Sequence, residues 1–563
     1  MKFESFEYQR PNMTQLSEAF TSALKAFEDA ECYEVQKSAM EIINQLRFDY
    51  DTMSTLASIR YSINTKDAFY DKENDFYDQN NPRYEQWVNR YYKALLNATY
   101  RLQLEADFGD LVFKIAEQSL ATFDDAIMDD LVIENSLVSK YDKLLASAEI
   151  AFDGKILNLS QMTPYTQSKD REIRKTAFAK ISAFFTENED TLDTIYDDLV
   201  HVRHRIAKTL GYRNFIELGY ARLGRLDYTS QDVANYREQV KTEIVPLAQN
   251  LVKRQGARLG IDPLMHYDAP LKFLTGNPTP KGDRETLVNH ARAMYQSMSP
   301  ETDAFFNFMI DRNLMDLDIK KGKSGGGYCT FIPNHNAPFI FANFNGTSHD
   351  VDVLTHEAGH AFQVYSSRHH PVPEYQWATM EASEIHSMSM EFFAWPWIES
   401  FFKEDTKKYQ FNHLAGAISF IPYGVAVDEF QHRMYENPNL TKAERKTIWR
   451  DLEKVYMPHI NYDDAFLERG GLWFRQSHIF SVPFYYIDYT LAQVCAFQYW
   501  SWSQKDKLSA WQSYLKLCQA GGSLSFLGLL ELAGLDNPFT AGTVAKVMPT
   551  ITAFLNTIDD KKL

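Results

Sequence analysis

The sequence predicts a mainly α-helical protein with a single small β-sheet. Residues 13 to about 150 carry apolar side chains at helical spacing and contain few prolines or glycines, as in the run Tyr84–Glu105. A further helix is expected over residues 285–314, and helices again dominate after residue 344. Between them, residues 316–344 combine glycine-rich turns with short apolar runs, a pattern typical of strands.

A break in the helical pattern divides the chain into two expected regions. Asp153-Gly154 and the segment Met162-Thr-Pro164 interrupt the periodicity, which returns over residues 169–204. We therefore expect an N-terminal helical region over residues 1–160 and a second, larger region over residues 161–563.

The overall charge and composition exclude several classes of partner. The 563 residues include 58 basic and 75 acidic side chains, a net charge of −17, whereas nucleic-acid binding needs a basic footprint. No apolar run is long enough to span a membrane, and the N-terminus lacks a signal-peptide pattern. With only four cysteines and no CxxC pair, we expect a cytoplasmic protein with neither nucleic-acid nor membrane partners.

The segment Val351–Ser366, which reads VDVLTHEAGHAFQVYS, predicts a metal site on a helix. His356 and His360 are four residues apart, so their rings share one face and can reach one tetrahedral metal ion. Glu357 lies about 100° around the helix, where it can reach a water molecule at the metal. This is the H-E-x-x-H pattern of zinc enzymes, and chance gives roughly 0.03 such matches in a chain with this histidine content. We expect one zinc ion per chain.

The third ligand is expected on the next helix, Met380–Trp395. Gln363 and Ser366 occupy the positions where the extended H-E-x-x-H-x-x-G-x-x-H motif requires Gly and His, so that motif is absent. Glu384 lies among apolar residues, where a carboxylate is costly unless it is paired or bound to metal. We assign it as the third ligand, and expect Glu381 and Glu391 to orient the imidazoles. The nearby histidines are assigned to the surface or to hydrogen bonds: His369, His370 and His386.

Several motifs resemble the thimet oligopeptidase and oligoendopeptidase F family of zinc peptidases, and its Pz-peptidase branch most. They are the run from Phe339 to His360, the segment Glu384-Ile-His-Ser-Met-Ser-Met-Glu391, and the start Tyr8-Gln-Arg-Pro-Asn12. The resemblance implies a two-lobed helical zincin of the gluzincin type, with zinc deep in a substrate channel and the N-terminal region forming one wall.

The resemblance also implies an activity, namely zinc-dependent hydrolysis of internal bonds in short, unfolded peptides, with Glu357 as the general base. One alternative is a zinc metallocarboxypeptidase with the same H-E-x-x-H chemistry. Another is a non-enzymatic helical scaffold, against which the intact Glu357 argues, because a structural metal site needs no base.

Further site residues are expected on three segments. In the family a histidine precedes tyrosines that stabilise the oxyanion and hold substrate, which here implies catalytic His478, Tyr486 and Tyr489 and a substrate-binding Tyr485. The glycines before Tyr328 are expected to form a flexible loop over the cleft: Gly325, Gly326 and Gly327. The strand Phe339–Asn343, which includes Ala342, is expected to offer an open edge to an extended peptide.

Overall fold

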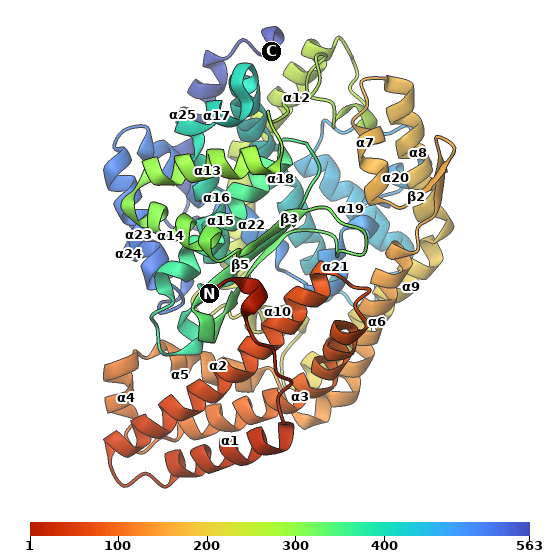
Figure 1. The fold of residues 1–563 in the computed structure, drawn as a ribbon. Helices are drawn as coiled ribbons and strands as arrows, with labels where there is room; N and C mark the ends of the chain where they lie inside the picture. The colour runs from red at the N-terminus through yellow and green to blue at the C-terminus, as the bar shows by residue number, and fades with distance from the viewer.

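The computed structural model describes residues 1–563, and α-helices make up most of it (Figure 1). The N-terminal part, at the bottom of that view, consists of five helices, of which α1, α2 and α3 pack against one another. These helices are α1 (Met13–Glu28), α2 (Tyr33–Ile63), α3 (Ala68–Leu96), α4 (Arg101–Phe108) and α5 (Leu111–Ala121).

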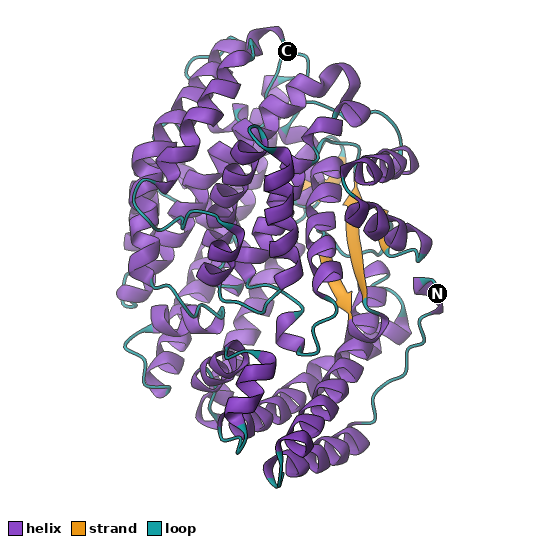
Figure 2. Cartoon of the chain, turned by 90° about the vertical axis from the view of Figure 1, so that its left-hand side faces the viewer, coloured by secondary structure: helices purple, strands orange, loops and turns teal.

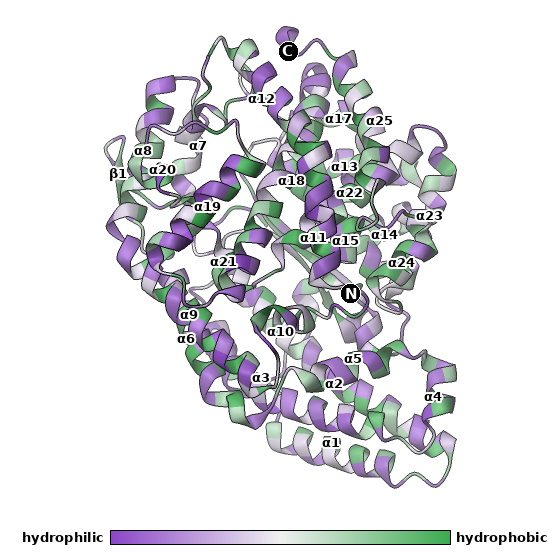
Figure 3. Ribbon diagram, turned by 180° about the vertical axis from the view of Figure 1, so that it is seen from behind, coloured by the Kyte–Doolittle hydropathy of each residue, from purple (hydrophilic) through white to green (hydrophobic).

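A second series of helices connects this part to the sheet. It comprises α6 (Met128–Ala146), α7 (Thr163–Thr166), α8 (Arg171–Glu187), α9 (Glu189–Thr209), α10 (Phe215–Arg222), α11 (Ser230–Gln239), α12 (Val245–Leu259), α13 (Arg284–Met298) and α14 (Pro300–Asp311). Hydrophobic and hydrophilic residues alternate along outer helices such as α6 and α9 (Figure 3). In α9 the buried Leu192, Ile195, Tyr196 and Leu199 recur at helical spacing, which explains why one face packs inward.

The C-terminal series is also helical. It comprises α15 (His349–Ser367), α16 (Met380–Phe393), α17 (Glu399–Phe402), α18 (Thr406–Glu436), α19 (Lys442–Tyr456), α20 (Ala465–Glu468), α21 (Ser477–Ser481), α22 (Tyr486–Ser503), α23 (Lys507–Ala520), α24 (Phe526–Ala533) and α25 (Thr543–Thr557). No helix combines the length and the apolar character needed to cross a membrane.

Strands form only a small part of the fold (Figure 2). β3 (Met315–Asp318), β4 (Tyr328–Ile332) and β5 (Ala337–Phe344) make one sheet in the order β3-β5-β4. β5 is central, parallel to β3 and antiparallel to β4. The sheet packs against α15, so it lies directly beside the helix that carries the H-E-x-x-H motif.

Two separate apolar cores give the molecule its two lobes. The smaller core belongs to α1–α5 and also receives Val372 and Tyr375, from the loop that follows α15. In that loop Glu374 accepts hydrogen bonds from Arg47 and Tyr92, each at 2.6 Å, which ties the lobes together. The larger core draws on most of the remaining helices and on the three-stranded sheet, including α6 through Tyr141. The separately packed N-terminal core therefore ends with α5. The expected division of the chain at residue 160 stays a prediction.

Several local expectations need correction. The helix expected over 84–105 ends at Leu96 and a new one begins at Arg101. The helix expected over 285–314 is broken at Ser299, whose hydroxyl caps the Thr302 amide ahead of a helix that starts with Pro300. A second, two-stranded sheet was missed: β1 (Ile150–Phe152) and β2 (Lys155–Leu157) flank the Asp153-Gly154 turn, whose residues both have positive φ.

Candidate metal centre and catalytic site

The site forms where α15 and α16 approach each other closely. Gly359, between the two motif histidines, permits this approach, because a Cβ atom there would lie 2.6 Å from Ser387 Cα and 2.7 Å from the His386 carbonyl oxygen. Contact at that distance is possible only for glycine. The packing brings Glu384, one turn before Ser387, opposite the histidine face of α15.

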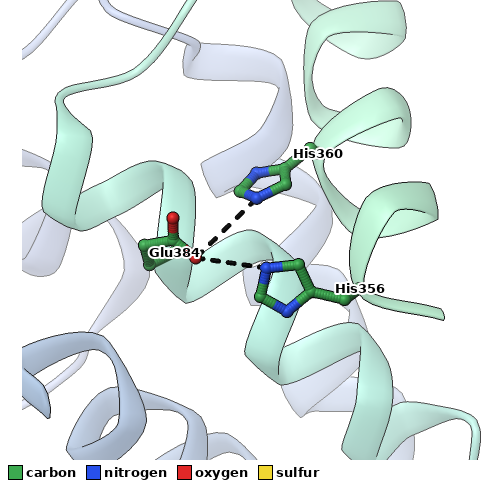
Figure 4. Close-up of side chains that lie close together, drawn as sticks. All are labelled: His356, His360 and Glu384. Atoms are coloured by element: carbon green, nitrogen blue, oxygen red, sulfur yellow. Dashed lines mark ion pairs between the residues drawn. The ribbon is translucent and has the colours of Figure 1, made fainter. Parts of the chain in front are cut away.

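His356, His360 and Glu384 converge on one point (Figure 4). Glu384 Oε2 lies 3.3 Å from His356 Nε2 and 3.7 Å from His360 Nε2, and one ligand atom from each residue falls within 4.8 Å of the others. Two imidazole nitrogens and a carboxylate oxygen are a donor set that suits zinc and leaves a fourth position open. The residues present therefore fit a catalytic rather than a closed structural metal site.

Metal binding needs neutral imidazole and ionised carboxylate, the forms that His360 and Glu384 adopt. At His356 burial favours the neutral ring, but Glu384 and Glu391 outweigh burial and raise the pKa, so a metal ion bound there must displace a proton. Burial lowers the pKa of His360 to about 4, so its ring is neutral. Burial alone would raise the pKa of Glu384, but His360, His356 and the Tyr485 hydroxyl lower it to about 2. The Tyr485 hydroxyl donates to Glu384 Oε1 at 3.0 Å, and the Ser387 hydroxyl donates to Oε2 at 3.1 Å.

The two neighbouring acids on α16 have different surroundings. Glu391 accepts a hydrogen bond from His356 Nδ1 at 2.7 Å, as expected for an orienting group, and a second from His413 Nε2 on α18 at 2.6 Å. Glu381 instead lies beside Arg225 and Tyr228, where burial raises its pKa against the influence of both. The expectation that Glu381 orients an imidazole is therefore wrong. The part of α16 that carries Glu381 lies against Arg225 and Tyr228 rather than against the metal-binding histidines.

Glu357 lies beside the convergence point and is 7% exposed. Its Oε2 atom is buried without a hydrogen-bond partner, so no protein group competes for it. Burial raises the pKa of the Glu357 carboxyl to about 7, and the negative charges of Glu384 and Glu391 act in the same direction, whereas His356 lowers it. A carboxylate with these properties can accept a proton near neutral pH.

His478 and the three tyrosines form one aromatic cluster. The His478 ring centroid lies 5.9, 4.9 and 6.0 Å from those of Tyr485, Tyr486 and Tyr489. Tyr485 contacts Glu384 directly, and its ring lies 5.0 Å from that of Tyr489. Tyr486 turns toward α18, where its ring lies 5.9 Å from the Tyr423 ring. Tyr485 and Tyr489 thus lie on the side of Glu384, and Tyr486 lies on the other side.

A strained residue holds the tyrosine segment in place. Phe484 has a φ of +67°, a region that residues other than glycine rarely adopt. Its carbonyl accepts a hydrogen bond from Arg225 at 2.6 Å, and its amide donates to Gln431 at 3.0 Å. Arg225 also pairs with Asp488 at 2.7 Å, with both side chains fully buried. The sequence analysis missed this anchor, because a buried arginine distant in the chain leaves no local signal.

The glycine loop Gly325–Gly327 and the three-stranded sheet also border the site. A Cβ atom on Gly327 would lie 3.7 Å from Glu357 Oε1, so the loop Gly325–Gly327 ends against the proposed base. The expectation of an open edge at Phe339–Asn343 is wrong, because β5 is the central strand and Ala342 is 1% exposed. β4 is an edge strand that borders the site, and α2 packs beside it.

The remaining histidines lie outside the convergence point. His386 is fully buried against Tyr514 of α23, rather than at the surface. His369 is exposed, and a ring nitrogen of His370 lies 3.3 Å from the Gln519 carbonyl oxygen. His413, which the sequence analysis did not single out, contacts Glu391 and accepts a hydrogen bond from the Trp395 indole at 3.3 Å.

This fold, with a His-Glu-x-x-His helix facing a glutamate on the next helix, defines a helical zincin of the gluzincin type. The chain belongs to peptidase family M3, whose family model matches residues 164–274 and 301–548. A model of the peptidase M3 N-terminal domain matches residues 3–123. The resemblance to the oligoendopeptidase F branch is confirmed by the relatives of the chain.

Solved structures with more than half of their residues identical cover the whole chain. Pz peptidase A with an inhibitor is 53% identical with a TM-score of 0.95, over 100% of both chains. A protein described as an oligoendopeptidase F from Bacillus anthracis str. Ames is 52% identical with a TM-score of 0.91, over 100% of this chain and 99% of that one.

Curated relatives are more distant. The oligoendopeptidase F homolog of Borreliella burgdorferi is 24% identical over 68% of this chain and 64% of its own length. Oligopeptidase PepF of Bacillus subtilis is 23% identical over 66% of this chain and 55% of its own length. The chain thus matches less than two thirds of the length of these curated relatives.

Proposed function

We propose that the protein is a zinc-dependent endopeptidase that cleaves internal bonds of short, unfolded oligopeptides. The observation that carries this proposal is the convergence of His356, His360 and Glu384 beside the unpartnered carboxylate of Glu357. A closed structural site would have a fourth protein ligand and no need of a base. The relatives support a peptidase, since they include oligoendopeptidase F homologues and Pz peptidase A.

Glu357 is the proposed general base. A zinc ion held by the three ligands would polarise the scissile carbonyl and make a water molecule more acidic. Glu357 takes a proton from that water and later delivers it to the leaving amine, a role that its buried, otherwise unpaired oxygen can fill. The positive charge of zinc would oppose the effect of burial on the Glu357 pKa and keep the carboxylate ionised before the reaction starts.

His478, Tyr486 and Tyr489 are the proposed oxyanion and substrate donors, together with Tyr485. Hydroxyl and imidazole N–H groups placed where negative charge develops stabilise the transition state. The contact between Tyr485 and Glu384 supports a role for this segment at the metal, and the Arg225–Phe484 contacts keep it rigid.

A channel between the lobes is the proposed path of the substrate. A cleft of about 400 Å³ lies between α2 and β4, lined by residues that include Ser54, Ser58, Tyr328 and Thr330. An extended peptide can pair with the outer edge of β4 through its backbone, which requires no particular side chains. The N-terminal helices then act as one wall, with the catalytic region in residues 161–563, and a folded domain is too wide to enter.

The test is hydrolysis of one internally quenched peptide with both ends blocked. We expect cleavage, its loss with a chelator, and its recovery with one equivalent of zinc. The same segment placed inside a stable folded protein should resist cleavage, and equal cleavage there would rule out the channel. Release of single C-terminal residues from the unblocked peptide only would instead identify a carboxypeptidase.

A further inference from the structure

One buried arginine holds the tyrosine segment at two points. Arg225 lies between α10 and α11, and a single nitrogen of its guanidinium, Nη2, donates to the Phe484 carbonyl oxygen at 2.6 Å and to Asp488 Oδ1 at 2.7 Å. Phe484 directly precedes Tyr485, and in the same way Asp488 directly precedes Tyr489. Each of these tyrosines therefore follows a residue that Arg225 holds, and a shift of either one would have to disturb a buried contact.

The backbone at Phe484 needs support from outside the segment. Its φ of +67° is one that persists only where the surrounding structure imposes it. The Phe484 ring is fully buried against α10, where Gly219 leaves room for it, since a Cβ atom on Gly219 would lie 2.7 Å from the ring. Arg225 comes shortly after α10, so one part of the chain supports the ring and also binds the carbonyl group.

Two buried carboxyl groups share the Arg225 guanidinium. Asp488 pairs with it directly, and Glu381 of α16 lies close to both. Burial raises the pKa of both carboxyls although Arg225 lowers it, and the Glu381 charge raises the pKa of Asp488 further. One positive charge balances one carboxylate, so the other carboxyl keeps its proton. Loss of the guanidinium would leave no stranded charge, because the second carboxyl can then take a proton as well.

The held segment reaches the metal centre, whereas Arg225 does not. The Tyr485 hydroxyl donates to Glu384 Oε1 at 3.0 Å, and the Tyr489 ring lies 5.0 Å from the Tyr485 ring. The hydrogen bonds of the Arg225 guanidinium go to Phe484 and Asp488 and to no metal ligand. An effect of Arg225 on the reaction would therefore act through the segment that it holds.

We propose that Arg225 is a positioning residue for the reaction, an inference that rests on the proposed endopeptidase function. It fixes the backbone at Phe484 and the first turn of α22 at Asp488. The hydroxyls of Tyr485 and Tyr489 are thereby set in place before negative charge develops on the substrate. Donors that are already in place stabilise the transition state without having to move, and a displacement of about 1 Å can lower the rate about 100-fold.

A double-mutant cycle between Arg225 and Tyr489 tests this role. Arg225→Met and Tyr489→Phe should each lower kcat for the blocked, quenched peptide by about 100-fold at saturating zinc, with KM changed less than about threefold. The double variant should lose less than about tenfold beyond Arg225→Met, because the hydroxyl that Arg225 positions is already absent. Independent effects would instead multiply, to a loss of about 10⁴-fold.

Two further variants separate positioning from general damage to the fold. Arg225→Lys should recover about tenfold of the lost kcat, since one nitrogen makes both contacts and an ammonium group can replace it in part. Arg174→Met is the control, because Arg174 is another buried arginine, which binds Asp268 and the Ser168 carbonyl oxygen at 2.8 Å each. It should lower Tm but change kcat by less than about threefold.

The outcomes distinguish this inference from the proposed function. If the wild-type protein does not cleave the blocked peptide, the endopeptidase is rejected and this inference with it. If the wild type cleaves, three results would overturn the positioning role alone: wild-type kcat in Arg225→Met, losses that multiply in the double variant, or an equal loss in Arg174→Met. Should Arg225→Met fail to fold, Arg225→Lys takes its place in the cycle, and multiplied losses there would overturn the role in the same way.

Discussion

The Glu391 carboxylate lies 2.7 Å from Nδ1 of His356 and thereby sets the position of the proton on a predicted metal ligand. A carboxylate can only accept, so Nδ1 carries a hydrogen, which leaves Nε2, the ring nitrogen nearer Glu384, as the one that can bind a metal ion. Burial would raise the pKa of Glu391, but hydrogen bonds from His356 and His413 lower it to about 2, which keeps it an acceptor.

Glu391→Gln should therefore weaken zinc binding by about 10–100-fold, because the amide end of glutamine cannot accept from both imidazoles. Zinc affinity can be measured by competition with a chelating dye. Glu381→Gln is the matched control on the same helix and should bind zinc like the wild type, since Glu381 lies beside Arg225. The reverse pattern would show that the wrong acid has been assigned.

Glu357→Gln should keep zinc but lower kcat by about 10²–10⁴-fold, because glutamine cannot take a proton from water. The substitution preserves the side-chain volume at a buried position, so the fold should be maintained. Turnover of a quenched peptide and zinc content are measured on the same preparation. A variant with full zinc and near-normal turnover would refute the proposed role of Glu357.

The tyrosines should differ in their effects on the rate. Tyr489→Phe should lower kcat by roughly 10², the usual effect of removing one oxyanion donor, with less change in KM. Tyr486→Phe should lower it less, since Tyr486 turns toward Tyr423 and away from Glu384. Steady-state kinetics of both variants show which substitution lowers kcat more. Equal losses would contradict the assignment of Tyr489, rather than Tyr486, to the side of Glu384.

The sequence was sufficient to predict the helices of the site. The apolar spacing around His356 predicted a helix over 351–366, and the structure has α15 over His349–Ser367. The facing acid Glu384 followed from apolar neighbours on a second helix, because a lone carboxylate is costly there. Local periodicity determines which residues share a helix face, and this part of the geometry needs no knowledge of the fold.

Partners distant in the chain could not be predicted in this way. Glu381 and Glu391 share one stripe of α16, and only the packing of Arg225 near one and His413 near the other distinguishes them. The central position of β5 depends on strand order, which a run of apolar residues does not encode.

The pH dependence of stability should contain a contribution from Glu453. This carboxyl is fully buried, and burial raises its pKa from 4.5 to about 7, although Tyr462 donates to it at 2.7 Å and Arg450 lies 3.6 Å away. The native state therefore holds a proton that the unfolded chain releases above pH 4.5. Stability is lost as the pH rises through this window, by on the order of 3 kcal/mol above pH 7.

Glu453→Gln should remove this loss, because glutamine keeps the volume and an acceptor for Tyr462 but does not ionise. Its Tm should exceed that of the wild type at pH 8 and should not exceed it at pH 5. Both proteins are melted in chelator, so that metal binding does not contribute to the difference. A difference in Tm that does not vary with pH would show that Glu453 is ionised in the native state without penalty.

Gly359→Ala should disturb the metal centre although alanine is the better helix former. The gain in helix propensity is about 1 kcal/mol, whereas a Cβ atom 2.6 Å from Ser387 Cα must displace backbone, and overpacking of this kind costs about 1–3 kcal/mol. The displaced helix carries Glu384, and zinc sites tolerate only about 0.2 Å of change in ligand distance. We expect a lower Tm and zinc affinity reduced at least about tenfold.

Gly416→Ala is the control: Gly416 lies within α18 with no atom within 4 Å of its Cβ position, so the same change there should leave zinc binding intact. Wild-type zinc affinity and Tm in Gly359→Ala would show that α15 and α16 can separate without cost to the site.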